Sequence, residues 1–184
     1  YMRTDSVNLA ASAQGQILGL IEKTYGKQYV ELRTYKTKSK NAQEAHEAIR
    51  PTDAAREKAG NNEDQKKLYR LIRERTISSQ MADAKLMRTK ITTTIKEGDI
   101  PDFSATGSRV IFDGWLACET RARGEDVELP KISANEALTL KDVVSEEKHT
   151  ESLPRYSEAG LIKELEKRGI GRPSTYASII KTLY

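Results

Sequence analysis

The sequence predicts an α+β fold in which a helical lobe is joined to an antiparallel β-rich region and then to a short helix-turn-helix segment. Three observations support this: helical periodicity near the start, β-branched alternation in the middle, and a glycine turn between two helical stretches near the end. The expected parts are residues 1–84, 85–150 and 151–184.

The first lobe is predicted to contain two long helices. The first begins after Ser6, which is expected as its N-cap, and stops at Gly26. The second runs from Asp64 to about Met81, with its period set by leucine and isoleucine. The apolar face expected for the first helix comprises Val7, Ala10, Ala13, Ile17, Leu20, Ile21 and Tyr25.

The middle region alternates and is rich in β-branched residues, which is typical of strands. A strand is predicted over 86–95, followed by a turn at 98–101. One or two strands are expected over 103–116, then a loop at 124–130 and another strand at 138–144.

The last region is predicted to be helical again. Leucine and isoleucine spacing indicates a helix over 158–167, and a turn from Gly169 to Arg172 follows it. Pro173 suits the first position of a further helix. Helix, glycine turn and helix together predict a helix-turn-helix unit.

Composition excludes two classes of protein and favours no single partner. The 184 residues carry 31 Lys and Arg against 27 Asp and Glu, a net charge of +4. No apolar run approaches the ~20 residues that span a bilayer, so we expect no membrane association. Cys118 is the one cysteine, which excludes a disulfide-stapled fold and suits a reducing compartment, so a cytoplasmic protein is expected. Because the chain starts with Tyr1, we interpret it as part of a longer protein.

The first candidate site is the opening hexapeptide, YMRTDS. The phenol of Tyr1 lies two residues from the guanidinium of Arg3, which could assist its ionisation and could hold phosphate oxygens. The alternative is a surface tyrosine at the end of an ordinary strand, followed by capping residues.

The second candidate site surrounds His46, which stands between Glu44 and Glu47. Carboxylates favour an imidazolium and orient it, so His46 could bind a phosphate or move a proton. The alternative is a solvated helix face. No metal site is expected, because there is no second histidine at ligand spacing and Cys118 has no cysteine partner. The other histidine, His149, is expected on the surface.

The third candidate site is the turn around Arg172, with Ser174 and Thr175 after it. Glycines allow a ligand to approach the backbone, and a helix start with a cation and hydroxyls can bind an anion. The alternative is that the segment is only the turn of an αα-hairpin and binds no ligand.

Taken together, these three segments resemble the active-site motifs of the type IA DNA topoisomerases. The segments YMRTDS, QEAHEAIRPTD and LIKELEKRGIGRPSTYASII occur in the family's order and span the whole chain. Met2 in place of proline favours the topoisomerase I branch. In that family the β-rich part forms an arch beside a CAP-like helical lobe, and we expect 85–150 to do so here.

The resemblance implies a specific reaction on DNA. The family cuts one strand by attack of a tyrosine, leaving a 5′-phosphotyrosine link and a free 3′-hydroxyl, and passes the other strand through the gap. Negative supercoils relax without ATP. By similarity Tyr1 is the nucleophile, Arg3 stabilises the transition state, and His46 lies near the scissile phosphate. Asp5 and Glu44 are expected to support His46. The residues expected to contact DNA are Thr4, Arg50, Arg172, Ser174 and Thr175.

The resemblance also implies what the chain lacks. The family's acidic Toprim domain, which binds Mg²⁺ for the full enzyme, precedes the tyrosine motif and is absent from this sequence. We therefore expect no cofactor in this chain, and no cleavage by the chain alone. The expected partner is a single-stranded segment of negatively supercoiled DNA, bound by a monomer. Two alternatives remain: a non-catalytic single-stranded DNA-binding module, and a structural protein without a nucleic-acid role.

Overall fold

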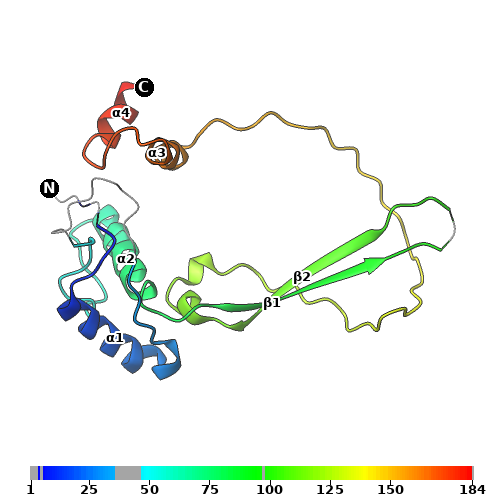
Figure 1. Cartoon of the computed structure of the whole chain (residues 1–184), viewed down its shortest axis with the longest axis horizontal. Coiled ribbons are helices and arrows are strands. Elements are labelled where there is room, and N and C mark those ends of the chain that lie inside the picture. Colours follow the sequence, from blue (N-terminus) through cyan, green and yellow to red (C-terminus); the bar gives the residue numbers. More distant parts are fainter. Residues whose placement is uncertain (1–3, 5, 36–46, 97, 184) are drawn as a thin grey trace. The chain divides into compact units, whose positions relative to one another are not determined.

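The residues that the structure describes form helices and one antiparallel sheet, which confirms the predicted α+β class. The computed structural model describes residues 4, 6–35, 47–96 and 98–183 (Figure 1). The described residues up to Pro130 form one compact unit, and those from Lys131 onward form a second.

Helix α1 spans Ala11–Tyr25 and supplies one wall of the core of the first unit. Ala13, Ile17 and Ile21 are its buried residues, as their helical spacing predicted. Gly26 ends the helix, also as predicted. The prediction of Ser6 as N-cap was wrong, because α1 begins after Ala10. The chain before it is extended and is hydrogen-bonded to a distant segment instead.

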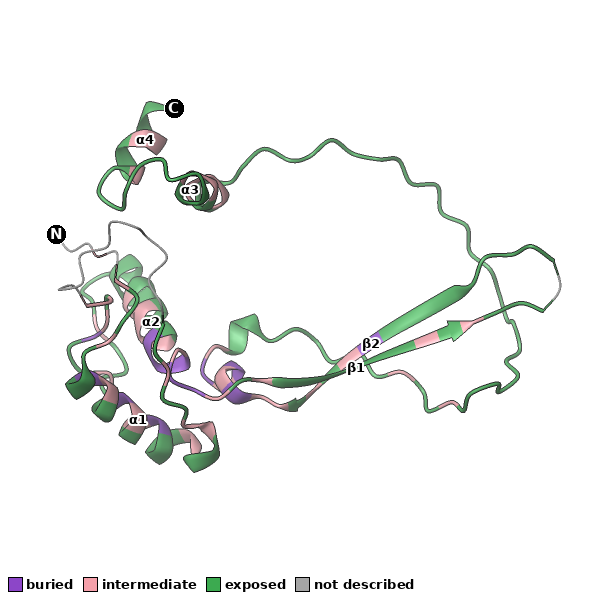
Figure 2. Cartoon of the chain, viewed as in Figure 1, coloured by how far each residue is buried: buried purple, intermediate pink, exposed green. Residues whose placement is uncertain are grey.

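Helix α2 spans Glu63–Ser78 and contributes the opposite wall. Asn62 caps it, because the side chain accepts a hydrogen bond from the backbone N–H of Gln65. Only the C-terminal turn of α2, residues Thr76, Ile77 and Ser78, is buried, and Figure 2 shows this end of the helix in purple. The buried cluster combines both helices with two later residues: Ala13, Ile17, Ile21, Ile77, Met81 and Cys118.

A two-stranded antiparallel ribbon extends from the helical part. Strand β1 covers Lys85–Thr93 and strand β2 covers Phe103–Phe112. The register pairs Leu86 with Val110 and continues to Thr93 with Phe103, with an irregularity next to Lys85. The prediction that strand structure continues to residue 116 was wrong, since a 3₁₀ turn occupies Gly114–Ala117.

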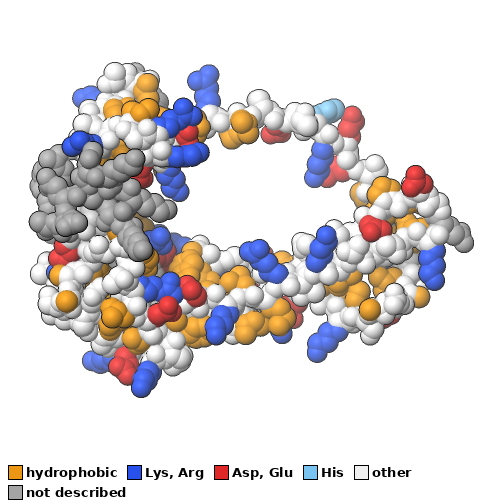
Figure 3. Space-filling model, viewed as in Figure 1, with side chains coloured by type: hydrophobic (Ala, Val, Ile, Leu, Met, Phe, Trp, Pro, Cys, Tyr) orange, Lys and Arg blue, Asp and Glu red, His pale blue; other side chains and the backbone are white. Residues whose placement is uncertain are grey.

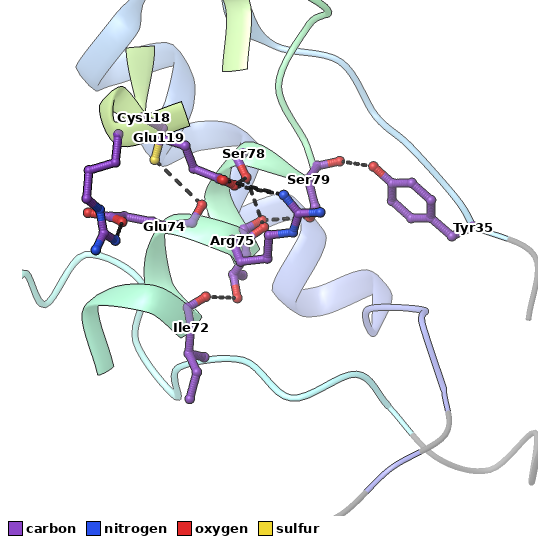
Figure 4. A network of polar contacts seen from close by, with 10 residues as sticks. Tyr35, Ile72, Glu74, Arg75, Ser78, Ser79, Cys118 and Glu119 are labelled. Carbon is purple, nitrogen blue, oxygen red and sulfur yellow. Dashed lines mark hydrogen bonds and ion pairs between the residues drawn. The ribbon is translucent and has the colours of Figure 1, made fainter. Parts of the chain in front are cut away.

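That 3₁₀ turn joins the ribbon to the helices. The N–H of Trp115 donates to the carbonyl of Ala82 at 2.9 Å, and the Tyr29 hydroxyl donates to Asp113 at 2.7 Å. Figure 4 shows a polar network beyond it, in which Glu119 accepts from Ser78 and pairs with Arg75 of α2. These contacts hold the base of the ribbon against the C-terminal end of α2.

The second unit contains two helices separated by a turn. Helix α3 spans Glu158–Lys167, as predicted, and Ser157 caps it by accepting from the N–H of Gly160. Helix α4 spans Tyr176–Thr182. The prediction that Pro173 opens this helix was wrong, because residues 172–175 form a hydrogen-bonded turn first.

The strand predicted over 138–144 is also absent. That stretch has no regular secondary structure, and its backbone has no strand partner among the described residues. Leu140 is 72% exposed and Val144 is 87% exposed. Alternating apolar residues become a strand only when a neighbouring strand pairs with them, and none does so here.

Candidate nucleic-acid interface

The structure describes five of the ten predicted site residues. Tyr1, Arg3, Asp5, Glu44 and His46 lie outside the described residues. The five that are described are Thr4, Arg50, Arg172, Ser174 and Thr175. The first two belong to the first unit, and the other three belong to the second.

In the first unit, the chain that follows the YMRTDS motif is bound directly to the HEAIRP segment. The N–H of Ala48 donates to the carbonyl of Asn8 at 2.8 Å. The N–H of Ala10 donates to the Glu47 carboxylate at 2.9 Å. The bond between Ala10 and Glu47 joins residues 37 apart in sequence. The chain just after the first motif is therefore anchored to Glu47 and Ala48 of the second motif.

The Glu47 carboxylate is the centre of this connection. Besides Ala10 it accepts two hydrogen bonds from Arg50, from Nε and from Nη2. The hydrogen bonds from Arg50 and then from Ala10 hold the pKa of Glu47 below its ordinary 4.5. Glu47 therefore stays ionised at neutral pH and acts as a fixed acceptor.

Arg50 lies in this cluster and is only partly exposed. Its third nitrogen, Nη1, donates to the carbonyl of Pro51 at 3.1 Å. All three guanidinium nitrogens thus have protein partners, and Glu47 offsets the positive charge. Its role as a DNA contact stays a prediction, and in this geometry such a contact would share the guanidinium with Glu47.

Thr4 is the described residue of the first motif. Its hydroxyl accepts a hydrogen bond from the N–H of Ser6 at 3.0 Å. Such a local turn sets the backbone direction at the end of the motif. The hydroxyl proton of Thr4 takes no part in this bond, so it can still donate to a phosphate oxygen.

The turn of the third motif is built around Arg172 and Thr175. The Thr175 hydroxyl accepts from the N–H of Arg172 at 2.8 Å and lies 3.1 Å from its carbonyl. Gly169 and Gly171 have φ of 69° and 77°, the left-handed values that favour glycine. Arg172 and Ser174 are exposed. The threonine hydroxyl therefore organises the turn, while the arginine and the serine side chains remain accessible.

The described ranges contain no group of three or more His, Cys, Asp or Glu side chains placed to hold a metal ion. Among the helices in those ranges, none combines the length and the apolar composition that a membrane span requires.

Comparison with known proteins assigns the family. The family model described as DNA topoisomerase matches residues 1–184. This chain belongs to the DNA topoisomerase family. A DNA topoisomerase 1 from Xylella fastidiosa is 42% identical over the whole chain, and one from Rickettsia felis is 43% identical.

A solved topoisomerase structure has the same fold. The full-length topoisomerase I of Thermotoga maritima superposes with a TM-score of 0.74 at 35% identity. The match covers 100% of this chain and 29% of the Thermotoga chain. The chain likewise spans about a quarter of the curated relatives, with 24% of the Xylella protein and 25% of the Rickettsia protein covered.

Sequence reasoning missed the role of Glu47. It treated this residue only as a carboxylate next to His46, whereas in the structure its carboxylate accepts a hydrogen bond from Ala10, just after the first motif. The signal was present in part, because Glu47 and Arg50 are spaced i, i+3 and can pair within one turn. The bond to Ala10 had no local signal, because it depends on how distant segments meet.

Proposed function

We propose that this chain is the part of a type IA DNA topoisomerase that carries the strand-cleaving tyrosine. Two observations support the proposal: the topoisomerase family model matches the whole chain, and the chain that directly follows YMRTDS is hydrogen-bonded to Glu47 and Ala48 of the HEAIRP segment. The second observation carries most weight, because a shared active site requires these motifs to be neighbours.

The chemistry is a reversible transesterification at phosphorus. The Tyr1 oxygen attacks a phosphodiester, forming a bond to phosphorus as the bond to the 3′ oxygen breaks. The products are a 5′-phosphotyrosine and a strand ending in a 3′-hydroxyl. Attack by that hydroxyl restores the DNA and frees the phenol. The bond energy is retained in the ester, so no ATP is required.

The chain's other residues would bind and orient the strand. Arg3 would stabilise charge on the phosphoryl oxygens as the bond forms, and His46 would contact the same phosphate. Exposed Arg172 and Ser174 suit contacts to the backbone of a single strand, as does the Thr4 hydroxyl. One such electrostatic contact is worth roughly 3 kcal/mol of barrier, so Arg3→Ala should slow cleavage by about two to three orders of magnitude.

The nucleophile is tested by Tyr1→Phe in a full-length protein that contains this chain. We expect the variant to bind single-stranded DNA normally but to form no covalent complex and to relax no supercoils. The measurement is a denaturing gel with labelled DNA, run beside a relaxation assay. Relaxation by the phenylalanine variant would overturn the assignment. Covalent complex missing from the unaltered protein would favour a non-catalytic binding module instead.

We further propose that cleavage needs Mg²⁺ bound by a Toprim domain outside this chain. The support is the resemblance of the motifs, together with the coverage of about a quarter of each curated relative. The 184-residue chain alone should then give no covalent complex with single-stranded DNA and Mg²⁺. Clear cleavage that disappears in Tyr1→Phe would contradict this.

A further inference from the structure

The two faces of the β1–β2 ribbon differ sharply in chemistry. Opposed residues of an antiparallel pair lie on the same face, and the faces alternate along each strand. One face carries Met87, Thr89, Ile91 and Thr93 opposite Arg109, Gly107, Ala105 and Phe103. The other, here called the basic face, carries Leu86, Arg88, Lys90 and Thr92 opposite Val110, Ser108, Thr106 and Ser104.

The basic face presents cations and hydroxyls without a carboxylate at any of its eight positions. Arg88 and Lys90 are exposed, as are Thr92, Ser104 and Thr106. Neither cation forms an ion pair with an acidic group in the described part of the chain, so both charges are available to a partner. Figure 3 shows Lys and Arg side chains projecting from the ribbon.

The opposite face is arranged differently. Its cation, Arg109, is paired with Glu128 at 3.4 Å. Gly107 is buried there, with Leu129 close to where a Cβ would be. At the outer edge of β2, Asp126 accepts a hydrogen bond from the backbone N–H of Val110 and pairs with Arg123. The segment around Val127 therefore pairs with the outer edge of β2 and packs on the Gly107 side, where Glu128 offsets the charge of Arg109. Arg88 and Lys90 on the basic face remain exposed.

We propose that the basic face binds the phosphate backbone of duplex DNA. Cationic and hydroxyl side chains are the groups that contact phosphates without reading sequence. Single-strand binders add aromatic side chains on which bases stack, and this face has none, whereas Phe103 lies on the other side. Phosphates that project from an already stacked duplex are therefore the better match.

This inference rests on the proposed function, because the basic face needs to hold duplex DNA only if the substrate is supercoiled DNA. A single-stranded segment of supercoiled DNA is flanked by duplex on both sides. A protein that cuts the single strand must also hold its neighbouring duplex while the gap is open. The ribbon offers a surface about 30 Å long for that purpose, at roughly 3.4 Å per residue.

The test is the salt dependence of DNA binding by the 184-residue chain. The variant Arg88→Gln/Lys90→Gln is compared with Arg109→Gln/Arg123→Gln, which removes two cations that are each paired with a carboxylate. Each phosphate contact contributes about 0.9 to the slope of log K against log salt for duplex DNA. The basic-face variant should lower the slope for a duplex of about 20 base pairs by about 1.8, and the control should leave it unchanged.

A second measurement locates the contact directly. Duplex DNA should protect Lys90 from acetylation, while Lys67 on α2 should react at the same rate with and without DNA. An unchanged duplex slope in the basic-face variant, or an equal loss in the control, would overturn the inference. So would a loss restricted to single-stranded DNA, or no duplex binding at low salt. None of these outcomes affects Tyr1-dependent cleavage, so the two proposals fail separately.

Discussion

At the scale of single residues, Gly114 determines how the β1–β2 ribbon packs on the helical part. Its φ of 49° is left-handed, and a Cβ on it would lie 2.5 Å from the carbonyl oxygen of Ala82. The next residue, Trp115, donates to that same carbonyl. The turn can close on the helical part only because residue 114 has no side chain.

Replacing Gly114 with alanine should therefore destabilise the first unit. We expect Gly114→Ala to cost about 2 to 3 kcal/mol, from backbone strain and the close contact. Urea unfolding followed by Trp115 fluorescence measures this. Gly15→Ala is the control, since nothing lies within 4 Å of its Cβ position and alanine should stabilise α1 by about 0.5 to 1 kcal/mol. Equal effects of the two changes would contradict the explanation.

Tyr25 makes the stability of this unit depend on alkaline pH. Burial, followed by interaction with Cys118, raises its pKa from 10.0 to about 12. Between those values the unfolded chain loses the phenolic proton while the folded chain keeps it, so stability should fall as pH rises from about 10 to 12. Tyr25→Phe should reduce this fall. Urea midpoints across that range test it, with Tyr156→Phe in the second unit as control, and an equal fall in both variants would exclude Tyr25 as the cause.

At the scale of elements, helix ends and strand pairing are set by different forces. Helix α2 begins with a reciprocal cap, in which Asn62 accepts from Gln65 and the Gln65 side chain accepts from the N–H of Asn61 at 2.7 Å. The ribbon, by contrast, is held at its base by contacts from outside itself, including Tyr29 to Asp113. The cap joins residues close together in sequence, whereas the contacts at the base of the ribbon join residues far apart in sequence.

Asn62→Ala should loosen the start of α2. Loss of an N-cap costs about 1 kcal/mol, so amide exchange in the first turn should become several-fold faster. Asn62→Asp keeps the acceptor and should retain most of the protection. Hydrogen exchange measured residue by residue distinguishes these variants. Faster exchange along the whole of α2, rather than at its start, would show that more than the cap had been lost.

At the scale of the whole molecule, the chain divides into two units. The first contains α1, α2 and the ribbon, and the second contains α3 and α4. The long exposed stretch before α3 has no regular secondary structure and carries apolar side chains such as Leu153, which is 95% exposed. Backbone without hydrogen-bonded structure is where proteases cut first.

Limited chymotrypsin digestion should therefore cut first after Leu140 or Tyr156, whereas Pro154 blocks cleavage after Leu153. Leu68 and Phe103 are also more than half exposed, yet their backbones belong to α2 and β2, so cleavage there should be slower. Mass spectrometry of a time course identifies the order of cuts. Early cleavage at Leu68 or Phe103 would contradict the predicted difference.

Much of the fold was predictable from neighbouring residues. The bounds of α3, the end of α1 at Gly26 and the hairpin turn after β1 all follow from spacing, caps and turn residues. The start of α1 was not, because Ala10 is bound by Glu47 from a distant segment. The stretch at 138–144 likewise has the pattern of a strand, but a pattern cannot supply the partner that a strand needs.

By itself the sequence determined the α+β class, the order of the helices and the membership of the topoisomerase family, because periodicity and motifs are local properties of the chain. Tertiary structure decided that Glu47 binds the chain just after the first motif and that Gly114 lets the ribbon pack on the helical part. It also decided that Arg88 and Lys90 lie exposed on the same face of the ribbon. Each of these depends on contacts between segments far apart in sequence, which long-range hydrogen bonding and burial select.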